Sequence, residues 1–147
     1  MLTLQDVGAR AFLKARFNNV WPSTKDLTLR LFTNNITPGD GDTAGTYTEA
    51  TGGGYAAKTL TCGSWTDSVV GGIAQVAYAL QSFSFTGALT TNGTVYGYYV
   101  TDGDGIIQFS ELLLGTDGTT PAPFTPAGAS DHIDITPIFK LSKGTPA

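Results

Sequence analysis

The chain has 147 residues, enough for one domain with a hydrophobic core that needs no metal or disulfide staples. Its net charge of −4 argues against a nucleic-acid partner, which would usually leave a basic footprint. The sequence contains no run of about 18 apolar residues, so no membrane-spanning segment and no membrane partner are predicted.

An N-terminal helix is predicted over Leu4–Phe17, the one window in which apolar residues follow helical spacing. Thr3 is expected to cap this helix together with Asp6, three residues later, as in a capping box. Trp21-Pro22 is expected to end it. Residues 1–22 therefore form a helix or arm, which either packs against the sheet or docks on a neighbouring subunit.

Short strands are predicted along the rest of the chain. Leu27–Thr33 alternates apolar and polar residues, as a half-buried strand does. Ile73–Phe85 is strand-like throughout, and its shift of phase near Gln81-Ser82 indicates a bulge. Asp131–Leu141 closes the domain, and Pro137 places this last strand at an edge or at a bend.

These elements predict the fold class. Seven or so short strands, turn signals every 8–15 residues and one short helix are typical of an all-β protein. We expect a single β-sandwich or jelly-roll-like domain at 23–142, preceded by the short N-terminal helix and followed by a loose tail at 143–147. Exposed loops are predicted at 34–45 and 115–128, where Gly, Pro, Asp and Thr are frequent.

A central β-hairpin is predicted from an aromatic, β-branched segment that meets an Asp/Gly turn. Thr94–Thr101 is expected to pair with Ile106–Leu113 around the turn Asp102-Gly103-Asp104-Gly105. Strand alternation places Tyr96, Tyr98 and Val100 on one face, and Val95, Gly97 and Tyr99 on the other. Since both faces are apolar, the strand is expected to be covered on both sides.

The same turn resembles part of a calcium-binding EF-hand loop. Asp102, Asp104 and Glu111 fall at the third, fifth and twelfth positions of such a loop. Val100 occupies the first position and has no side-chain oxygen, and no helix leads into the loop. We therefore interpret the segment as a hairpin turn and predict no metal site, while Asp102, Asp104 and Glu111 stay the candidate ligands. Asp40 and Asp42 could join them only if the fold brings the two loops together.

No catalytic or cofactor-binding motif is found, so the protein is predicted not to be an enzyme. The single histidine, His132, lies in the last predicted strand, where an ordinary surface residue is the more common finding. The single cysteine, Cys62, excludes an intrachain disulfide. Five aromatic residues could line a sugar-binding face or could pack in the core and at interfaces. They are Tyr55, Trp65, Tyr96, Tyr98 and Tyr99.

Several segments together resemble a family of small proteins encoded in the structural-gene modules of tailed bacteriophages. After the short helix these are Leu31-Phe32-Thr33-Asn34-Asn35, Tyr47-Thr48-Glu49-Ala50 with Gly54-Tyr55-Ala56, Val95-Tyr96-Gly97-Tyr98-Tyr99-Val100-Thr101-Asp102, and Asp134-Ile135-Thr136-Pro137-Ile138-Phe139. The resemblance covers most of the chain, and its motifs carry no catalytic or ligand residue.

The resemblance implies a non-enzymatic virion protein, a capsid decoration (cement) protein that bridges capsomers of the major capsid protein. Such proteins are commonly homotrimers. The N-terminal helix and the loops 39–45 and 115–128 are the expected contact regions. The protein would be made in the host cytoplasm, since no secretory signal is seen, and assembled there into the virion. The alternatives are a tail, neck or fibre component and a carbohydrate-binding module that contacts the host.

Overall fold

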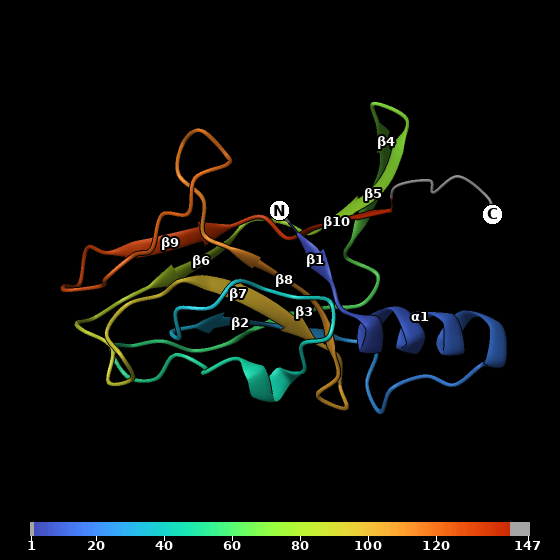
Figure 1. Cartoon of the computed structure of the whole chain (residues 1–147), viewed down its shortest axis with the longest axis horizontal. Helices are drawn as coiled ribbons and strands as arrows, with labels where there is room; N and C mark the ends of the chain where they lie inside the picture. Colours follow the sequence, from blue (N-terminus) through green and yellow to red (C-terminus); the bar gives the residue numbers. More distant parts are fainter. Residues whose placement is uncertain (1, 142–147) are drawn as a thin grey trace.

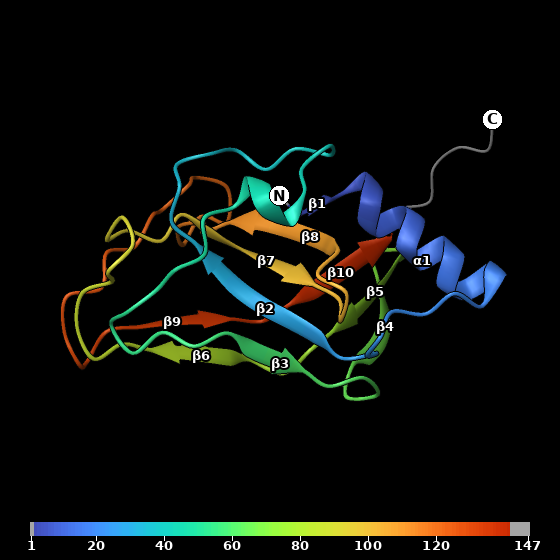
Figure 2. The same cartoon turned by 90° about the horizontal axis from the view of Figure 1, so that it is seen from below.

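The computed structural model describes residues 2–141 and shows a mostly β protein with one α-helix (Figures 1 and 2). The helix α1 spans Asp6–Asn18, and a single turn of 3-10 helix, η1, spans Ala44–Thr46. The strands are β1 (Thr3–Leu4), β2 (Leu27–Phe32), β3 (Lys58–Leu60), β4 (Thr66–Val70), β5 (Ile73–Ala77), β6 (Gln81–Ser84), β7 (Gly97–Thr101), β8 (Ile107–Leu112), β9 (His132–Ile135) and β10 (Ile138–Leu141). The prediction of a β-rich fold with a short N-terminal helix is confirmed.

The predicted hairpin forms the middle of the largest sheet. This antiparallel sheet has the order β1-β8-β7-β2-β3, and every residue of β7 is buried. The pairing of β7 with β8 opposes Tyr98 to Glu111 and Val100 to Phe109, with an irregularity between Val100 and Thr101. The central position and the pairing partner of this hairpin are therefore confirmed.

Both faces of this sheet are covered, as expected. On one face, β2, β7 and β8 share a core with β6 and β9, which pair with each other in a separate sheet. On the other face, Tyr47 stacks on Tyr99 with ring centroids 5.1 Å apart and also contacts Phe32. Tyr47 follows the loop 34–45, which was predicted to be exposed. Part of that loop instead covers the sheet, because Ile36 packs beside these rings.

The assignment of two residues to faces was wrong. Val95 lies in the core with Tyr98 and Val100, whereas Tyr96 packs on the opposite face with Tyr99. The regular strand begins only at Gly97, and Val95 forms an isolated bridge with Phe124. The alternation of side chains between the two faces is therefore broken before Gly97. A prediction that extends this alternation back to Thr94 assigns Val95 and Tyr96 to the wrong faces.

The predicted strand Ile73–Phe85 is two strands in two sheets. β5 pairs with β4 and β10, whereas β6 pairs with β9. The change of phase that was interpreted as a bulge is a bend between β5 and β6. The predicted strand Asp131–Leu141 is also divided, into β9 and β10, and its break lies beside this bend. Tyr78 N–H donates to the carbonyl of Pro137 at 2.9 Å across the bend. These four strands thus form one bent two-stranded ribbon, with Pro137 at the bend as predicted.

The helix is close to its predicted range but has different ends. Thr3 belongs to β1, opposite Ser110 of β8, so it does not cap the helix. Gln5 takes the N-cap position and makes no side-chain capping bond. The helix ends at Asn19, whose left-handed backbone (φ of 55°) stops it before Trp21-Pro22. None of the helices formed by residues 2–141 has the length and apolar character that a membrane span needs.

Candidate interaction surface at the projecting end

Two elements extend from one end of the molecule. Figure 1 shows α1 and the β4–β5 hairpin near the same end of the molecule, where the helix extends along the long axis and the hairpin rises away from it. We call the surface formed by α1, residues 19–21, β4, β5 and β10 the projecting end.

The base of α1 is held by close backbone packing and by hydrogen bonds. Gly8 lies against β8, where a Cβ atom would stand 2.6 Å from Gln108 Cα. Only a residue without a side chain allows this approach. The N–H of Gln5 donates to the Gln108 carbonyl, and the N–H of Asp6 donates to the Asp40 carbonyl at 2.9 Å. The start of the helix is therefore fixed on the sheet.

A buried polar network lies directly beneath this base. Gln5 Nε2 donates to Ser110 Oγ at 2.6 Å, and Ser110 Oγ lies 2.9 Å from the Tyr47 hydroxyl. Tyr47 donates in turn to Asp42 Oδ2 at 2.8 Å, and the same oxygen accepts the Gly39 N–H. Burial raises the pKa of the Tyr47 hydroxyl, which keeps it protonated as this chain of bonds requires. The network joins helix, sheet and loop.

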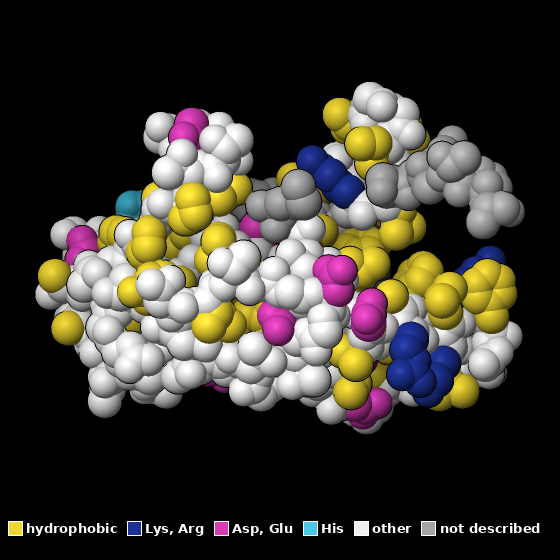
Figure 3. Space-filling model, in the orientation of Figure 1, with side chains coloured by type: hydrophobic (Ala, Val, Ile, Leu, Met, Phe, Trp, Pro, Cys, Tyr) yellow, Lys and Arg dark blue, Asp and Glu magenta, His cyan; other side chains and the backbone are white. Residues whose placement is uncertain are grey.

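Beyond its base, α1 presents large apolar side chains to solvent. Gly8 is the one buried residue of the helix. The exposed fractions are 53% for Phe12, 52% for Leu13 and 77% for Phe17, and Val20 and Trp21 are more than half exposed as well. Figure 3 shows these apolar atoms gathered along the helix. Exposed apolar surfaces of this kind are typical of interaction sites in proteins.

The β4–β5 hairpin adds a second apolar projection. All five residues of β4 are exposed, with Val69 at 71% and Val70 at 59%. The turn Gly71-Gly72 has positive φ at both positions, 58° and 79°, as a tight hairpin turn needs. Among residues 2–141, the two valines at the hairpin tip belong to neither hydrophobic core cluster.

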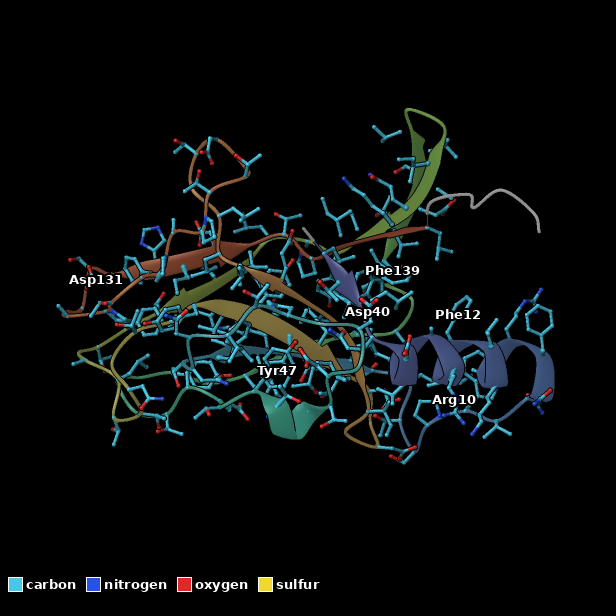
Figure 4. The ribbon with its side chains drawn as sticks, viewed as in Figure 1. Arg10, Phe12, Asp40, Tyr47, Asp131 and Phe139 are labelled. Carbon is cyan, nitrogen blue, oxygen red and sulfur yellow. The ribbon has the colours of Figure 1, made fainter. Side chains whose placement is uncertain are left out.

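A narrow apolar groove of about 280 Å³ separates the two projections. It is lined by Leu4, Gly8, Phe12, Leu27, Trp65, Val76, Gln108, Phe109 and Phe139. In Figure 4, Phe12 lies on the side of α1 that faces Phe139 of β10, and Arg10 lies on the opposite side. The helix thus has one apolar side turned toward the groove and further apolar residues turned away from it.

Charge is distributed unevenly between this end and the rest of the chain. Residues 6–26 carry four of the eight Lys and Arg residues but two of the twelve acidic residues. The basic residues are Arg10, Lys14, Arg16 and Lys25, and the Lys25 ammonium lies 4.8 Å from the centre of the Trp21 ring. The projecting helix is therefore basic on an acidic protein.

The structure places the candidate calcium ligands in separate structural roles. Asp102 Oδ1 accepts the N–H groups of Asp104 and Ile106 at 3.0 and 2.9 Å, which closes the hairpin turn. Asp104 Oδ1 accepts the Ser23 N–H, and hydrogen bonding by the Ser23 side chain and then by its backbone lowers the pKa of Asp104. Glu111 lies along β8, where its carboxylate accepts the Tyr98 hydroxyl at 2.6 Å. Among residues 2–141 no three acidic, His or Cys side chains gather as metal ligands would.

The other candidate residues are also dispersed. Asp40 and Asp42 belong to the contacts at the base of α1, so they do not meet Asp102 and Asp104 through any hydrogen bond described. His132 is exposed, with its ring nitrogens 3.4 Å from the Ser130 carbonyl and 3.7 Å from the Asp134 carboxylate.

The aromatic residues considered for sugar binding pack within the protein. Tyr98 and Tyr99 are buried, at 6% and 4% exposed, so their ring faces are not offered to a ligand. Tyr55 donates to Glu49 and lies over Phe83, while the Trp65 ring packs on Tyr78. Tyr96 packs against the cluster that contains Tyr99, and Trp65 lines the apolar groove, so the five residues are spread over different parts of the fold.

No family model, curated protein or solved structure matches the chain. The geometry of the projecting end is thus the main guide to function. The sequence left open whether α1 packs against the sheet or docks on a neighbouring subunit, and it gave the β4–β5 hairpin no role in binding. The available signal was the pair Val69-Val70 directly before Gly71-Gly72, because a solvent-facing hairpin tip is usually polar.

Proposed function

We propose that the protein is a non-enzymatic virion component, a decoration (cement) protein that binds the capsid shell built from the major capsid protein. The resemblance of its strand segments to small structural proteins of tailed bacteriophages supports this proposal. So does the layered β arrangement, in which β6 and β9 share a core with the five-stranded sheet. We assign that arrangement to the β-sandwich class.

The observation that carries the proposal is the projecting end. An isolated helix of 13 residues is marginal in water, and α1 buries little of itself against its own sheet. The chain nevertheless fixes the base of this helix with close backbone packing and a buried network. A rigidly mounted helix with uncovered apolar residues is the expected form of an assembly contact, in which the partner supplies the missing cover.

The β4–β5 hairpin is the part of this end that we assign to the capsid. Its tip offers Val69 and Val70, and covering such side chains contributes on the order of 1 kcal/mol each. Individually weak contacts of this kind suffice on a shell, because many copies bind a repeating lattice of identical sites. The acidic remainder of the protein faces solvent in this arrangement.

Copy number in purified virions tests the proposed location. A decoration protein is expected in roughly hundreds of copies per particle, whereas a tail or neck protein follows the lower symmetry of those parts and is present in roughly six or twelve. Quantitative gel analysis or imaging of particles gives this number. A count of six or twelve would refute the capsid assignment.

A binding assay tests the assigned surface. Shells that lack the protein are mixed with the purified chain and sedimented. Val69→Ser combined with Val70→Ser is expected to weaken binding on the order of tenfold or more, from the lost apolar burial. Leu80→Ser is the matched control, because Leu80 is 57% exposed but lies outside the projecting end. Equal loss in both variants would contradict the assignment.

A further inference from the structure

A second concave site lies on the other side of α1 from the apolar groove, and we call it the α1 cleft. Its volume is about 300 Å³. It is bordered by one side of the helix, by the residues that directly follow the helix and by the turn of the central hairpin. The residues that line it are Val7, Arg10, Ala11, Lys14, Val20, Trp21, Pro22, Asp102, Asp104 and Ile106. The four helical residues are spaced three or four apart, so they share one side of α1.

Hydrogen bonds fix the segment 19–24, which forms the second wall of the cleft. Figure 1 shows this segment running back beneath the helix toward the hairpin turn. At the helix end, the Val20 N–H donates to the Lys14 carbonyl at 3.2 Å. At the other end, the Ser23 N–H donates to Asp104 Oδ1 at 3.0 Å. Because the walls are tied together in the free protein, a ligand pays little to order them.

The floor of the cleft is apolar and open to solvent. Val20 and Trp21 are more than half exposed, and Ile106 is 39% exposed. Val7 and Ala11 are half-buried beneath them on the helix. Trp and Arg side chains supply a large share of the binding energy in protein interfaces, and this cleft offers one of each. An apolar side chain of a ligand would therefore be covered on several sides.

The charged residues of the cleft differ in how far their charges are already compensated. Asp102 accepts three hydrogen bonds within the hairpin turn, and Asp104 accepts the Ser23 N–H. Within residues 2–141, neither the Arg10 nor the Lys14 side chain has an ion-pair partner. Figure 4 shows Arg10 on the side of the helix away from Phe12 and the groove. The uncompensated charge of the cleft is therefore positive and lies on its α1 side.

We propose that the α1 cleft binds an acidic peptide segment of a partner protein. An apolar side chain of that segment lies on the floor against Trp21, and a neighbouring carboxylate pairs with Arg10 and Lys14. Residues 6–26 are basic although the whole chain has a net charge of −4, so an acidic partner is steered to this end of the molecule. The site is separate from the β4–β5 tip, and the proposal stands whether or not that tip binds the shell.

Other ligands fit the charges less well. A basic peptide would meet Arg10 and Lys14 as like charges, and the Asp102 carboxylate is committed to the turn. A nucleic acid carries anionic groups, but its phosphates extend well beyond a cleft of this size, along a chain that is acidic outside residues 6–26. A short acidic segment places its charge at the cleft alone.

NMR titration of the isotope-labelled full chain tests the ligand class. The probe is acetyl-Glu-Leu-Glu-amide, and its matched control is acetyl-Gln-Leu-Gln-amide, which has nearly the same shape without the charges. The acidic probe is expected to shift the resonances of Arg10, Lys14 and the Trp21 indole. Two solvent-exposed ion pairs should make it bind about fivefold more tightly than the neutral control. Equal affinity of the two probes would refute the charge recognition.

Substitutions on α1 test the site. Arg10→Gln combined with Lys14→Gln should weaken the acidic probe about fivefold, leave the neutral probe unchanged and keep good helix formers in α1. Arg16→Gln is the matched control, since Arg16 lies about 200° around the helix from Lys14, and it should change affinity by less than about twofold. Circular dichroism verifies that each variant is folded. An equal loss in the control and in the double variant would contradict the site.

Asp104→Asn tests the sign of the charge that the cleft accepts. Asparagine keeps a side-chain oxygen for the Ser23 N–H but removes a negative charge from the cleft. The acidic probe should then bind about twofold more tightly, because a like charge has been removed. Weaker binding of the acidic probe by this variant would show that the cleft prefers a cation, and it would refute the proposal.

Three further results would overturn the proposal. These are resonances of the cleft that do not move at millimolar acidic probe, tighter binding of the basic probe acetyl-Lys-Leu-Lys-amide, and tighter binding of a short oligothymidylate through Arg10 and Lys14. The last result would indicate a nucleic-acid ligand. Because the titration uses no capsid, failure of the cleft leaves the shell-binding result standing, and failure of shell binding leaves the cleft standing.

Discussion

Replacing Ser110 by alanine is expected to loosen the mounting of α1 and to destabilise the whole fold. Ser110 is fully buried and lies between Gln5 and Tyr47. The substitution removes both hydrogen bonds and leaves the Gln5 amide with a long contact of 3.5 Å to the Gly39 carbonyl. Gln5 Oε1 is already buried without a partner, so the site has little capacity to compensate.

The cost follows from these contacts. A hydrogen bond contributes about 1 kcal/mol net, and a buried polar group left unpaired costs about 1–3 kcal/mol. Tyr47 keeps its bond to Asp42, so the larger share of the loss falls on Gln5. We therefore expect Ser110→Ala to lower the free energy of unfolding by about 2 kcal/mol.

Urea denaturation measures this loss. Ser82→Ala is the matched control, since Ser82 lies on an exposed position of β6, and it should change stability by less than about 0.5 kcal/mol. Tyr47→Phe removes the hydroxyl but keeps the ring on Tyr99. In a double-mutant cycle with Ser110→Ala it should show a coupling of about 1 kcal/mol. A Ser110→Ala protein as stable as the control would refute the role of the network.

Three other predictions concern the titration of Tyr99, the stability of the hairpin turn and calcium binding. Burial, followed by the nearby Glu49 carboxylate, raises the pKa of Tyr99 from 10.0 to about 12, so the stability it contributes is complete below pH 10 and is lost as pH rises toward 12. Urea midpoints should fall over that range, and less steeply in Tyr99→Phe; an unchanged slope would contradict the assignment. Asp102→Ala removes three accepted hydrogen bonds and should cost about 1–2 kcal/mol in thermal or urea unfolding, whereas Asp67→Ala on exposed β4 should cost little. Calorimetry with calcium should show no binding tighter than about millimolar, and a micromolar site lost in Asp104→Ala would contradict the turn interpretation.

The central hairpin was predictable because its local chemistry and its place in the fold agree. The residues from Gly97 to Thr101 favour a strand, the Asp/Gly turn favours reversal, and apolar residues on both sides indicate cover on both faces. Asp102 then closes the turn through its own carboxylate, as short polar side chains do. Each of these signals lies within a few residues of the structure that it predicts.

The bent ribbon and the helix base were not predictable in the same way. Each half of Ile73–Phe85 keeps its own alternation, and nothing in a single segment tells that its two halves pair with different sheets. Gln5 lies between a two-residue strand and a helix, and its partner Ser110 is 105 residues away. The sequence showed that α1 has apolar residues but not that its own domain would leave them uncovered.

The bent ribbon also makes the projecting end inseparable from the core. β10 connects through Pro137 to β9, and β5 connects through residues 78–80 to β6. Phe83 of β6 and Ile133 and Ile135 of β9 are buried. A partner that holds the hairpin therefore holds two strands of the core, and its binding energy adds to the stability of the whole domain by mass action. Under the proposed decoration role, binding to the shell would therefore also stabilise the bound protein against unfolding.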